Sequence, residues 1–382
     1  MKKLQSLGNL GRFFGANETL CGQQALAGLS RLNVHRALLI CSNSVFNTHS
    51  EYIKRCLSRF TLEIIILKSG EPTIANMKEA LNITACFAPD VIVAIGGGSV
   101  IDSAKLIWAI SEKPELNFAL NKKMYHVSNL RSKISRFVAV PTTYGSGSEN
   151  SSAAVFQFDA SDQKRFLVGS ELLPDVAVLD PALAVGLPTD VAINGVMDSL
   201  AHLIEGYVSL SSNSMLRRLS VASLINIKQD LDINSFARSI NIQSIVENYM
   251  VTSSFAGIVQ NIANPGLAHS LSHYCAKFGV SHGAACGYFL PFSIEYNSLN
   301  TLICEQYESL ASDIGFKDRK YLSEWLVELC AEFNIGSRMP NTQQIIQDFD
   351  SECFLNDPTI DANPTEIKVN ELLDMMSGFY EK

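Results

Sequence analysis

The sequence predicts an α/β domain with a parallel sheet, followed by an all-α domain. In the first half, short apolar runs alternate with amphipathic stretches of helical length, and each run ends at glycine, serine or proline. From about Pro188 onward the helical period dominates and few strand runs occur. Buried strands separated by helices are typical of a parallel sheet with helices on both faces.

Each element has its own signal in the sequence. The predicted strands are the apolar runs 37–41, 62–67, 91–95 and 137–140. Residues 74–86 predict a helix between the second and third strands, and the second half predicts long helices at 235–258 and 320–333. The change of pattern between Asp180 and Pro188 indicates the boundary. We therefore expect a dinucleotide-binding domain over residues 1–184 and a helical domain over residues 185–382.

Composition restricts the class of protein. The chain has 382 residues, of which 47% are hydrophobic and 18% charged, as expected for a globular protein of two domains. The sequence has no long uncharged apolar stretch, so no membrane helix is predicted. Its N-terminus lacks the apolar core of a signal peptide. The net charge of −8 and the absence of basic blocks disfavour nucleic-acid binding. Nine scattered cysteines fit reduced thiols in a cytoplasm.

A glycine turn follows the third predicted strand. Gly96, Gly97, Gly98 and Ser99 stand between that strand and a helical pattern over 100–106. Glycine permits close approach of a ligand to the backbone, and the N–H groups of the new helix favour an anion such as a pyrophosphate. The structural alternative is a tight turn capped by Ser99. The polar loop 141–149 follows the fourth strand, where open α/β sheets bind ligands.

Histidines cluster in the second half. Asp198 and His202 are four residues apart on a predicted helix, as are His269 and His273, and His282 follows. An i,i+4 ion pair or satisfied core histidines would also explain this pattern. In apolar surroundings, an aspartate with three imidazoles suits Fe(II), Zn(II), Co(II) or Mn(II) and leaves room for a substrate oxygen.

These motifs together resemble the iron-containing, or group III, alcohol dehydrogenase family over almost the whole length. The markers are Gly96 to Ser99 with Asp102 and Lys105, Pro141 to Glu149, Leu173 to Asp175 with Asp180 and Pro181, Met197 to Glu205, and His269 to His282. The resemblance implies the fold shared with dehydroquinate synthase, an α/β dinucleotide domain and a helical domain. It also implies hydride transfer between a nicotinamide and a small alcohol or carbonyl compound.

The resemblance assigns roles to individual residues. It implies Asp198, His202, His269 and His282 as metal ligands, and His273 as a catalytic residue that relays a proton. Dinucleotide contacts are implied at Gly97, Gly98, Ser99, Thr142, Thr143 and Ser146, with Lys164 near the nicotinamide ribose. The implied metal is Fe(II), with Zn(II) as the alternative. The cofactor is NAD or NADP, because Ser42 replaces the aspartate of NAD-preferring relatives. Relatives are often homodimers or larger.

Two other functions remain open from the sequence. Sugar-phosphate cyclases of the dehydroquinate synthase type share the architecture, the dinucleotide and a metal, but they need several cationic side chains for an anionic substrate. The helical half offers Arg217 and Arg218 but no clear basic cluster near the histidines. A non-catalytic dinucleotide-binding assembly protein with a vestigial site is the second alternative.

Overall fold

The computed structural model describes residues 11–380 except positions 69, 71, 117, 119–122, 159–163 and 232–235. The chain forms two compact units. The sheet unit consists of Gly15–Pro188 and Ala237–Gly257. The helical unit consists of Thr189–Phe236, Ile258–Lys382 and a short N-terminal piece that ends at Phe14. The expected boundary between residues 184 and 185 stays a proposal, as does the expected assignment of one domain to each half of the chain.

The sheet unit is built on a parallel sheet. Within the described residues, six strands follow the order β1-β9-β6-β4-β2-β3, and every neighbouring pair is parallel. The strands are β1 Glu18–Cys21, β2 Arg36–Ser42, β3 Thr61–Leu67, β4 Val91–Gly96, β6 Arg136–Pro141 and β9 Val176–Leu179. The carboxyl ends of β2, β4 and β6 therefore lie at one edge of the sheet, as in other ligand-binding α/β folds.

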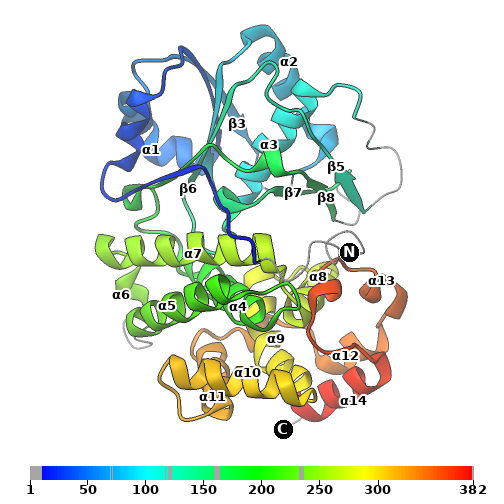
Figure 1. Ribbon diagram of the computed structural model, residues 1–382. Helices are drawn as coiled ribbons and strands as arrows, with labels where there is room; N and C mark the ends of the chain where they lie inside the picture. Colours follow the sequence, from blue (N-terminus) through cyan, green and yellow to red (C-terminus); the bar gives the residue numbers. More distant parts are fainter. Residues whose placement is uncertain are drawn as a thin grey trace. The chain divides into compact units, whose positions relative to one another are not determined.

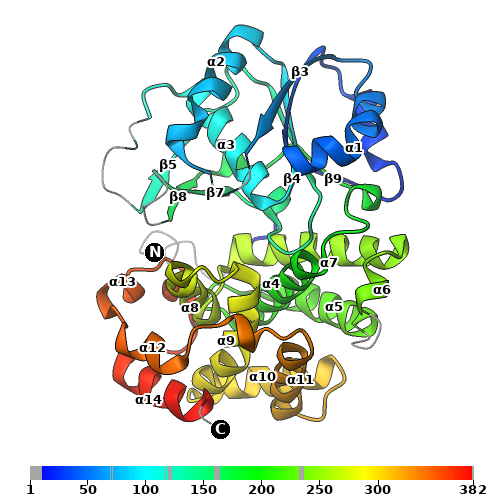
Figure 2. The same ribbon diagram turned by 180° about the vertical axis from the view of Figure 1, so that it is seen from behind.

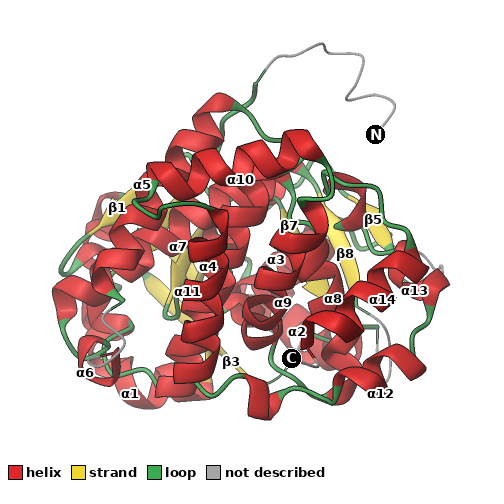
Figure 3. Ribbon diagram, turned by 90° about the horizontal axis from the view of Figure 1, so that it is seen from below, coloured by secondary structure: helices red, strands yellow, loops and turns green. Residues whose placement is uncertain are grey.

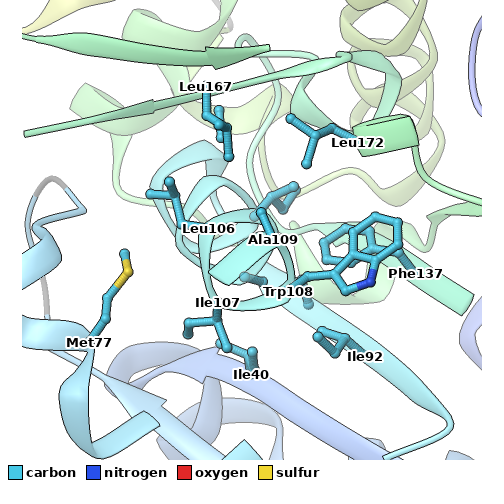
Figure 4. Close-up of a cluster of buried hydrophobic side chains, with 14 of the residues drawn as sticks. Ile40, Met77, Ile92, Leu106, Ile107, Trp108, Ala109, Phe137, Leu167 and Leu172 are labelled. Carbon is cyan, nitrogen blue, oxygen red and sulfur yellow. The ribbon is translucent and has the colours of Figure 1, made fainter. Parts of the chain in front are cut away.

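Helices cover both faces of this sheet, as the continuous apolar runs predict. Helix α1 (Asn43–Cys56) lies on one face, and α2 (Lys78–Phe87) and α3 (Gly98–Glu112) lie on the other (Figure 1; seen from behind in Figure 2). Alternate strand residues point to opposite sides, so Leu38 packs with α3 while Leu39 packs with α1. In Figure 4, Trp108 of α3 lies against Phe137 of β6, with 5.1 Å between the ring centroids.

The fold class predicted from the sequence is confirmed, and the predicted strands match β2, β3, β4 and β6 within one residue at each end. The short strands β1 and β9 were not predicted. Neither was a second sheet of order β5-β8-β7, made of β5 Met124–His126, β7 Ala153–Phe156 and β8 Arg165–Val168. The helix expected over 74–86 begins instead with a 3₁₀ turn, Ile74–Met77, and becomes α2.

Helices make up the helical unit (Figure 3). They are α4 Thr189–Val208, α5 Ser214–Asp230, α8 Leu267–Cys275, α9 His282–Asn297, α10 Thr301–Asp313, α11 Arg319–Glu332, α12 Thr342–Gln347, α13 Ser351–Leu355 and α14 Val369–Tyr380. The helix expected over 320–333 is α11. The helix expected over 235–258 is interrupted after α6 (Phe236–Ser239) and resumes as α7 (Gln243–Ala263). Its predicted first residue, Ser235, lies outside the described residues.

Two glycines bring α9 close to α4. A Cβ at Gly283 would lie 1.9 Å from the carbonyl oxygen of Asn194, and one at Gly287 would lie 2.4 Å from Cε of Met197. Only glycine fits at such an approach. Because the two glycines are one helical turn apart, they fix the contact along the face of α9 that begins at His282. Among the described residues, no helix combines the length and the apolar content needed to cross a membrane.

Candidate active site

Asp198 stands at the centre of the histidine cluster in the helical unit. Helix α4 places His202 one turn after Asp198, and the distance from Asp198 Oδ1 to His202 Nε2 is 3.8 Å. Helix α8 contributes His269, whose Nε2 lies 3.6 Å from the same oxygen, and α9 contributes His282 at 3.5 Å. The structure thus brings together the four residues for which the resemblance implies a metal.

The chemistry of this cluster fits a bound cation. Asp198 Oδ1 and His269 Nε2 are buried and make no hydrogen bond with any residue that the structure describes. A buried polar atom without a partner is costly, so a ligand at this point would restore what the protein leaves unsatisfied. Donors that share one metal at bond lengths near 2.1 Å lie about 3.4 Å apart in a tetrahedral arrangement, close to the distances observed here.

Other side chains fix the orientation of two of the imidazoles. Glu205 Oε2 lies 2.6 Å from His269 Nδ1, and Ser272 Oγ lies 2.6 Å from His282 Nδ1. In both rings the hydrogen bond is made at Nδ1, so Nε2 faces Asp198. Such bonds behind a metal-binding histidine set its tautomer and its basicity. Glu205 lies seven residues after Asp198 on α4, a spacing that places both on one helix face.

Cys286 is a further donor at the cluster. It follows His282 by one turn of α9, is fully buried, and its Sγ lies 3.7 Å from His282 Nε2. One donor atom from each of Asp198, His269, His282 and Cys286 lies within 4.8 Å of the others. Burial raises the pKa of the Cys286 thiol.

Electrostatic coupling within the cluster is strong. Burial alone would raise the pKa of Asp198, but the neighbouring imidazoles lower it below its ordinary value. Burial alone would lower the pKa of His269, but Cys286 and the carboxylates of Asp198 and Glu205 raise it above its ordinary value. Both directions are those expected where a positive charge is favoured beside the Asp198 carboxylate. A divalent cation would meet the same negative potential.

His273 lies beside the cluster rather than within it. Its ring stacks on that of His282, with 5.2 Å between the centroids and 12° between the planes. Its Nδ1 lies 2.9 Å from Asp357 Oδ2, and Asp357 in turn accepts hydrogen bonds from the backbone N–H and the hydroxyl of Thr359. Asp357 is thus fixed by its own turn and orients His273.

In the sheet unit, the glycine turn and the second polar loop lie side by side. Strands β4 and β6 are neighbours, and the N–H of Thr142 donates to Gly96 O. A Cβ at Gly97 would lie 3.3 Å from Thr143 Oγ1, and one at Gly98 would lie 2.7 Å from Ser146 Oγ. The residues for which dinucleotide contacts are implied therefore surround the start of α3.

The tight strand-to-helix turn of the alternative interpretation is present between β4 and α3, but the cap expected at Ser99 is wrong. Helix α3 begins at Gly98 after the N-cap residue Gly97, and no side chain caps it in the part of the chain that the structure describes. The first-turn N–H groups of a helix without such a cap can bind an anion.

Lys105 fixes the second loop to α3. This lysine is fully buried, and its Nζ donates to the carbonyl oxygens of Ser148, Ser151 and Ala153. Burial lowers the pKa of Lys105 to about 8 and raises that of the neighbouring Glu149 to about 7. Lys164 lies elsewhere, directly before β8 in the second sheet. Its role near the nicotinamide ribose stays a prediction.

Comparison with known proteins decides the family. Residues 16–181 match the family described as iron-containing alcohol dehydrogenase, and residues 192–378 match the C-terminal domain of the same family. The chain belongs to the iron-containing alcohol dehydrogenase family. It is 28% identical over 368 residues to an alcohol dehydrogenase of Thermococcus barophilus, a match that covers 91% of this chain and 93% of the relative.

Two further relatives agree with this family. An NADPH-dependent butanol dehydrogenase of Clostridium saccharobutylicum is 27% identical over 386 residues, with 97% of this chain and 98% of the relative covered. The iron-containing alcohol dehydrogenase structure from Thermococcus thioreducens has a TM-score of 0.86 and 26% identity, over 97% of this chain and all of the other. As an iron-containing alcohol dehydrogenase, the chain is an oxidoreductase that acts on alcohols with a nicotinamide dinucleotide.

Sequence reasoning assigned no role to several residues of this site. The sequence carried a usable signal for Glu205, at a spacing of seven from Asp198, and for Cys286, at a spacing of four from His282. It carried none for Asp357, which is 84 residues from the histidine that it orients.

Proposed function

We propose that Asp198, His202, His269 and His282 bind one divalent metal, Fe(II) or Zn(II), and that the enzyme interconverts a small alcohol with its aldehyde or ketone. The observation that carries this proposal is the buried oxygen of Asp198 with the Nε2 atoms of three imidazoles 3.5, 3.6 and 3.8 Å away. One carboxylate with three imidazoles suits these metals and is too rich in nitrogen for calcium.

When bound, the metal would stabilise negative charge on the substrate oxygen as a Lewis acid, and the nicotinamide would exchange a hydride with the substrate carbon. The protein's own residues do the rest. Glu205 and Ser272 hold the rings of His269 and His282 so that both Nε2 atoms face the carboxylate of Asp198.

His273 is proposed to move the proton between the substrate oxygen and solvent. Its Nδ1 is hydrogen-bonded to Asp357, and the proton exchange is proposed to take place at Nε2. His273 is partly buried, with 19% of its side chain exposed, and this exposure supports its role in proton exchange with solvent. The carboxylate of Asp357 would stabilise the imidazolium that forms when His273 accepts the proton.

The dinucleotide is proposed to bind where the glycine turn meets the second loop. Gly97, Gly98 and Ser99 would hold the pyrophosphate at the start of α3, a position that the helix dipole favours. Further contacts with the dinucleotide are proposed for Thr142, Thr143, Ser146 and Lys164. The close approach of Ser146 to Gly98 supports this placement, since a side chain at Gly98 would fill the space.

Both NAD and NADP are proposed as cofactors. Ser42 ends β2 and caps α1, where its Oγ accepts a hydrogen bond from Val45 N at 3.3 Å. A carboxylate at this strand end would bind ribose hydroxyls and repel a 2′-phosphate, whereas a serine does neither strongly. The relative from Clostridium saccharobutylicum is named as NADPH-dependent. The replacement Ser42→Asp should lower kcat/KM with NADP and not with NAD.

The enzyme is proposed to act in the cytoplasm without a nucleic-acid partner. All nine cysteines are free thiols, as expected in a reducing cytoplasm. The net charge of −8 disfavours a nucleic-acid partner, and the enzyme is proposed to act as a homodimer or larger homo-oligomer.

A panel of small alcohols and aldehydes tests the function. Each is assayed by nicotinamide absorbance with NAD or NADP, using metal-free protein reloaded with Fe(II) or Zn(II). Turnover that depends on both metal and nicotinamide is expected. Full turnover without metal, or turnover with none of these substrates, would contradict the proposal.

A further inference from the structure

The thiol of Cys286 faces the same point as the proposed metal ligands. Its Sγ belongs to the set of four donors, with those of Asp198, His269 and His282, that lie within 4.8 Å of one another. The residue is fully buried, so its sulfur contacts the cluster and not solvent.

Helix packing explains why the sulfur lies there. Residues three and four apart share a helix face, so Cys286 shares a face with both His282 and Gly283. Gly283 meets the backbone of α4 at Asn194, and Gly287, the next residue after Cys286, meets Met197 on the same helix. The two contacts hold this turn of α9 against α4. Asp198 follows Asn194 by four residues on α4, so it lies one helical turn from the contact with Gly283.

Distances within the cluster match a shared cation. With metal–nitrogen bonds near 2.1 Å and metal–sulfur bonds near 2.3 Å, two ligands at the tetrahedral angle lie about 3.6 Å apart. The distance between Cys286 Sγ and His282 Nε2 is 3.7 Å. The second observation is independent of the cysteine. His269 Nε2, in a residue that is only 2% exposed, has no hydrogen-bond partner among the described residues, and it belongs to the same set of donors.

We propose that Cys286 is a further, sulfur ligand of the metal that Asp198, His202, His269 and His282 bind. This inference rests on the proposed function of the cluster as a metal site. Cys286 would hold the cation as a thiolate, with the proton of the thiol lost to solvent on binding, and the thiolate and the Asp198 carboxylate together would balance the two charges of the cation. Because thiolate is a soft ligand that zinc accepts readily, the sulfur shifts the preference of this site toward Zn(II).

Cobalt substitution tests the proposal directly. Metal-free enzyme is loaded with Co(II), and the absorption spectrum is recorded for the wild type, for Cys286→Ser and for the control Cys330→Ser. Cys330 is also buried, and its thiol donates to the carbonyl oxygen of Gly287, but it is not one of the four donors. A thiolate–cobalt charge-transfer band is expected in the wild type and in the control, and its complete loss is expected in Cys286→Ser.

Three outcomes would overturn the proposal. Cobalt-loaded wild type without a charge-transfer band would show a metal site without sulfur, and a band that persists in Cys286→Ser would place the sulfur on another cysteine. In both cases the proposed function stands. If the wild type binds no cobalt at all, the proposed metal site fails as well.

A second measurement needs no variant. X-ray absorption of the zinc-loaded wild type is expected to show one sulfur at about 2.3 Å from the metal. A first shell of nitrogen and oxygen alone would overturn the proposal even if Cys286→Ser does not fold.

Discussion

Replacing Glu205 by glutamine tests how the protein holds His269. The Glu205 side chain is 2% exposed and accepts five hydrogen bonds within the helical unit. Its Oε1 accepts from Ala268 N at 2.6 Å and Ser293 Oγ at 3.1 Å, and its Oε2 accepts from Gly266 N at 3.1 Å and from His269 N and Nδ1 at 3.4 and 2.6 Å. An amide has one accepting oxygen, so Glu205→Gln cannot serve all five donors.

The cost depends on how the new amide turns. If its oxygen faces His269, the N–H of Ala268 loses its acceptor, whereas the hydroxyl of Ser293 can rotate to accept. One unsatisfied buried donor costs about 1–3 kcal/mol of folding free energy. If its NH₂ group faces His269, the ring must accept at Nδ1 and carry its proton on Nε2, which then cannot bind a metal. In either case the imidazole loses its carboxylate partner, so metal affinity should fall about 10–100-fold.

Metal affinity is measured by competition with a chelator, and stability by urea denaturation of the metal-free protein. The matched control is Glu324→Gln, an exposed glutamate on α11 of the same unit, which should change stability by less than about 0.5 kcal/mol. Wild-type metal affinity in Glu205→Gln would refute the reasoning that this carboxylate holds His269 for a metal.

The other predictions concern two glycines and a buried acid. Gly98→Ala should weaken dinucleotide binding about tenfold or more with unchanged metal content, because its Cβ would lie 2.7 Å from a serine oxygen. Dinucleotide binding is measured by calorimetry. The control Gly336→Ala, whose Cβ would have nothing within 4 Å, should bind the dinucleotide normally. Gly283→Ala should lose metal by elemental analysis, since its Cβ would lie 1.9 Å from a carbonyl oxygen of α4, and retained metal would contradict the packing argument. Burial raises the pKa of Glu149 from 4.5 to about 7. Its contribution to stability is therefore complete below pH 4.5 and declines by about 3 kcal/mol as pH rises through 7. Urea denaturation at several pH values should show a smaller decline in Glu149→Gln, and an equal decline would refute the assignment.

The central strands were predictable because they are buried on both faces. In β2 and β4 nearly every residue is apolar, and such runs are the strongest signal a strand can give. Strands β1 and β9 have four residues each, and β1 is mostly exposed. Their pairing joins residues more than 150 positions apart, so no local pattern marks it.

The proposed metal site was predictable only in part. Asp198 and His202 share a helix face, so their spacing indicated that they act together. The approach of α9 to α4 depends on Gly283 and Gly287, whose effect becomes visible only when the helices are packed. The same packing brings Cys286 to the cluster. Asp357 reaches His273 from a turn near the C-terminus, and nothing in the sequence relates the two.

The most direct test of the proposed site is metal content and turnover measured together on the same preparations. Wild type, His202→Gln and His282→Gln are each stripped with a chelator and reloaded with Fe(II) or Zn(II). We predict one metal per chain and alcohol-dependent reduction of the nicotinamide in the wild type, and loss of both in each variant. Undiminished turnover by the stripped wild type, or by a variant that holds no metal, would contradict the role given to these histidines.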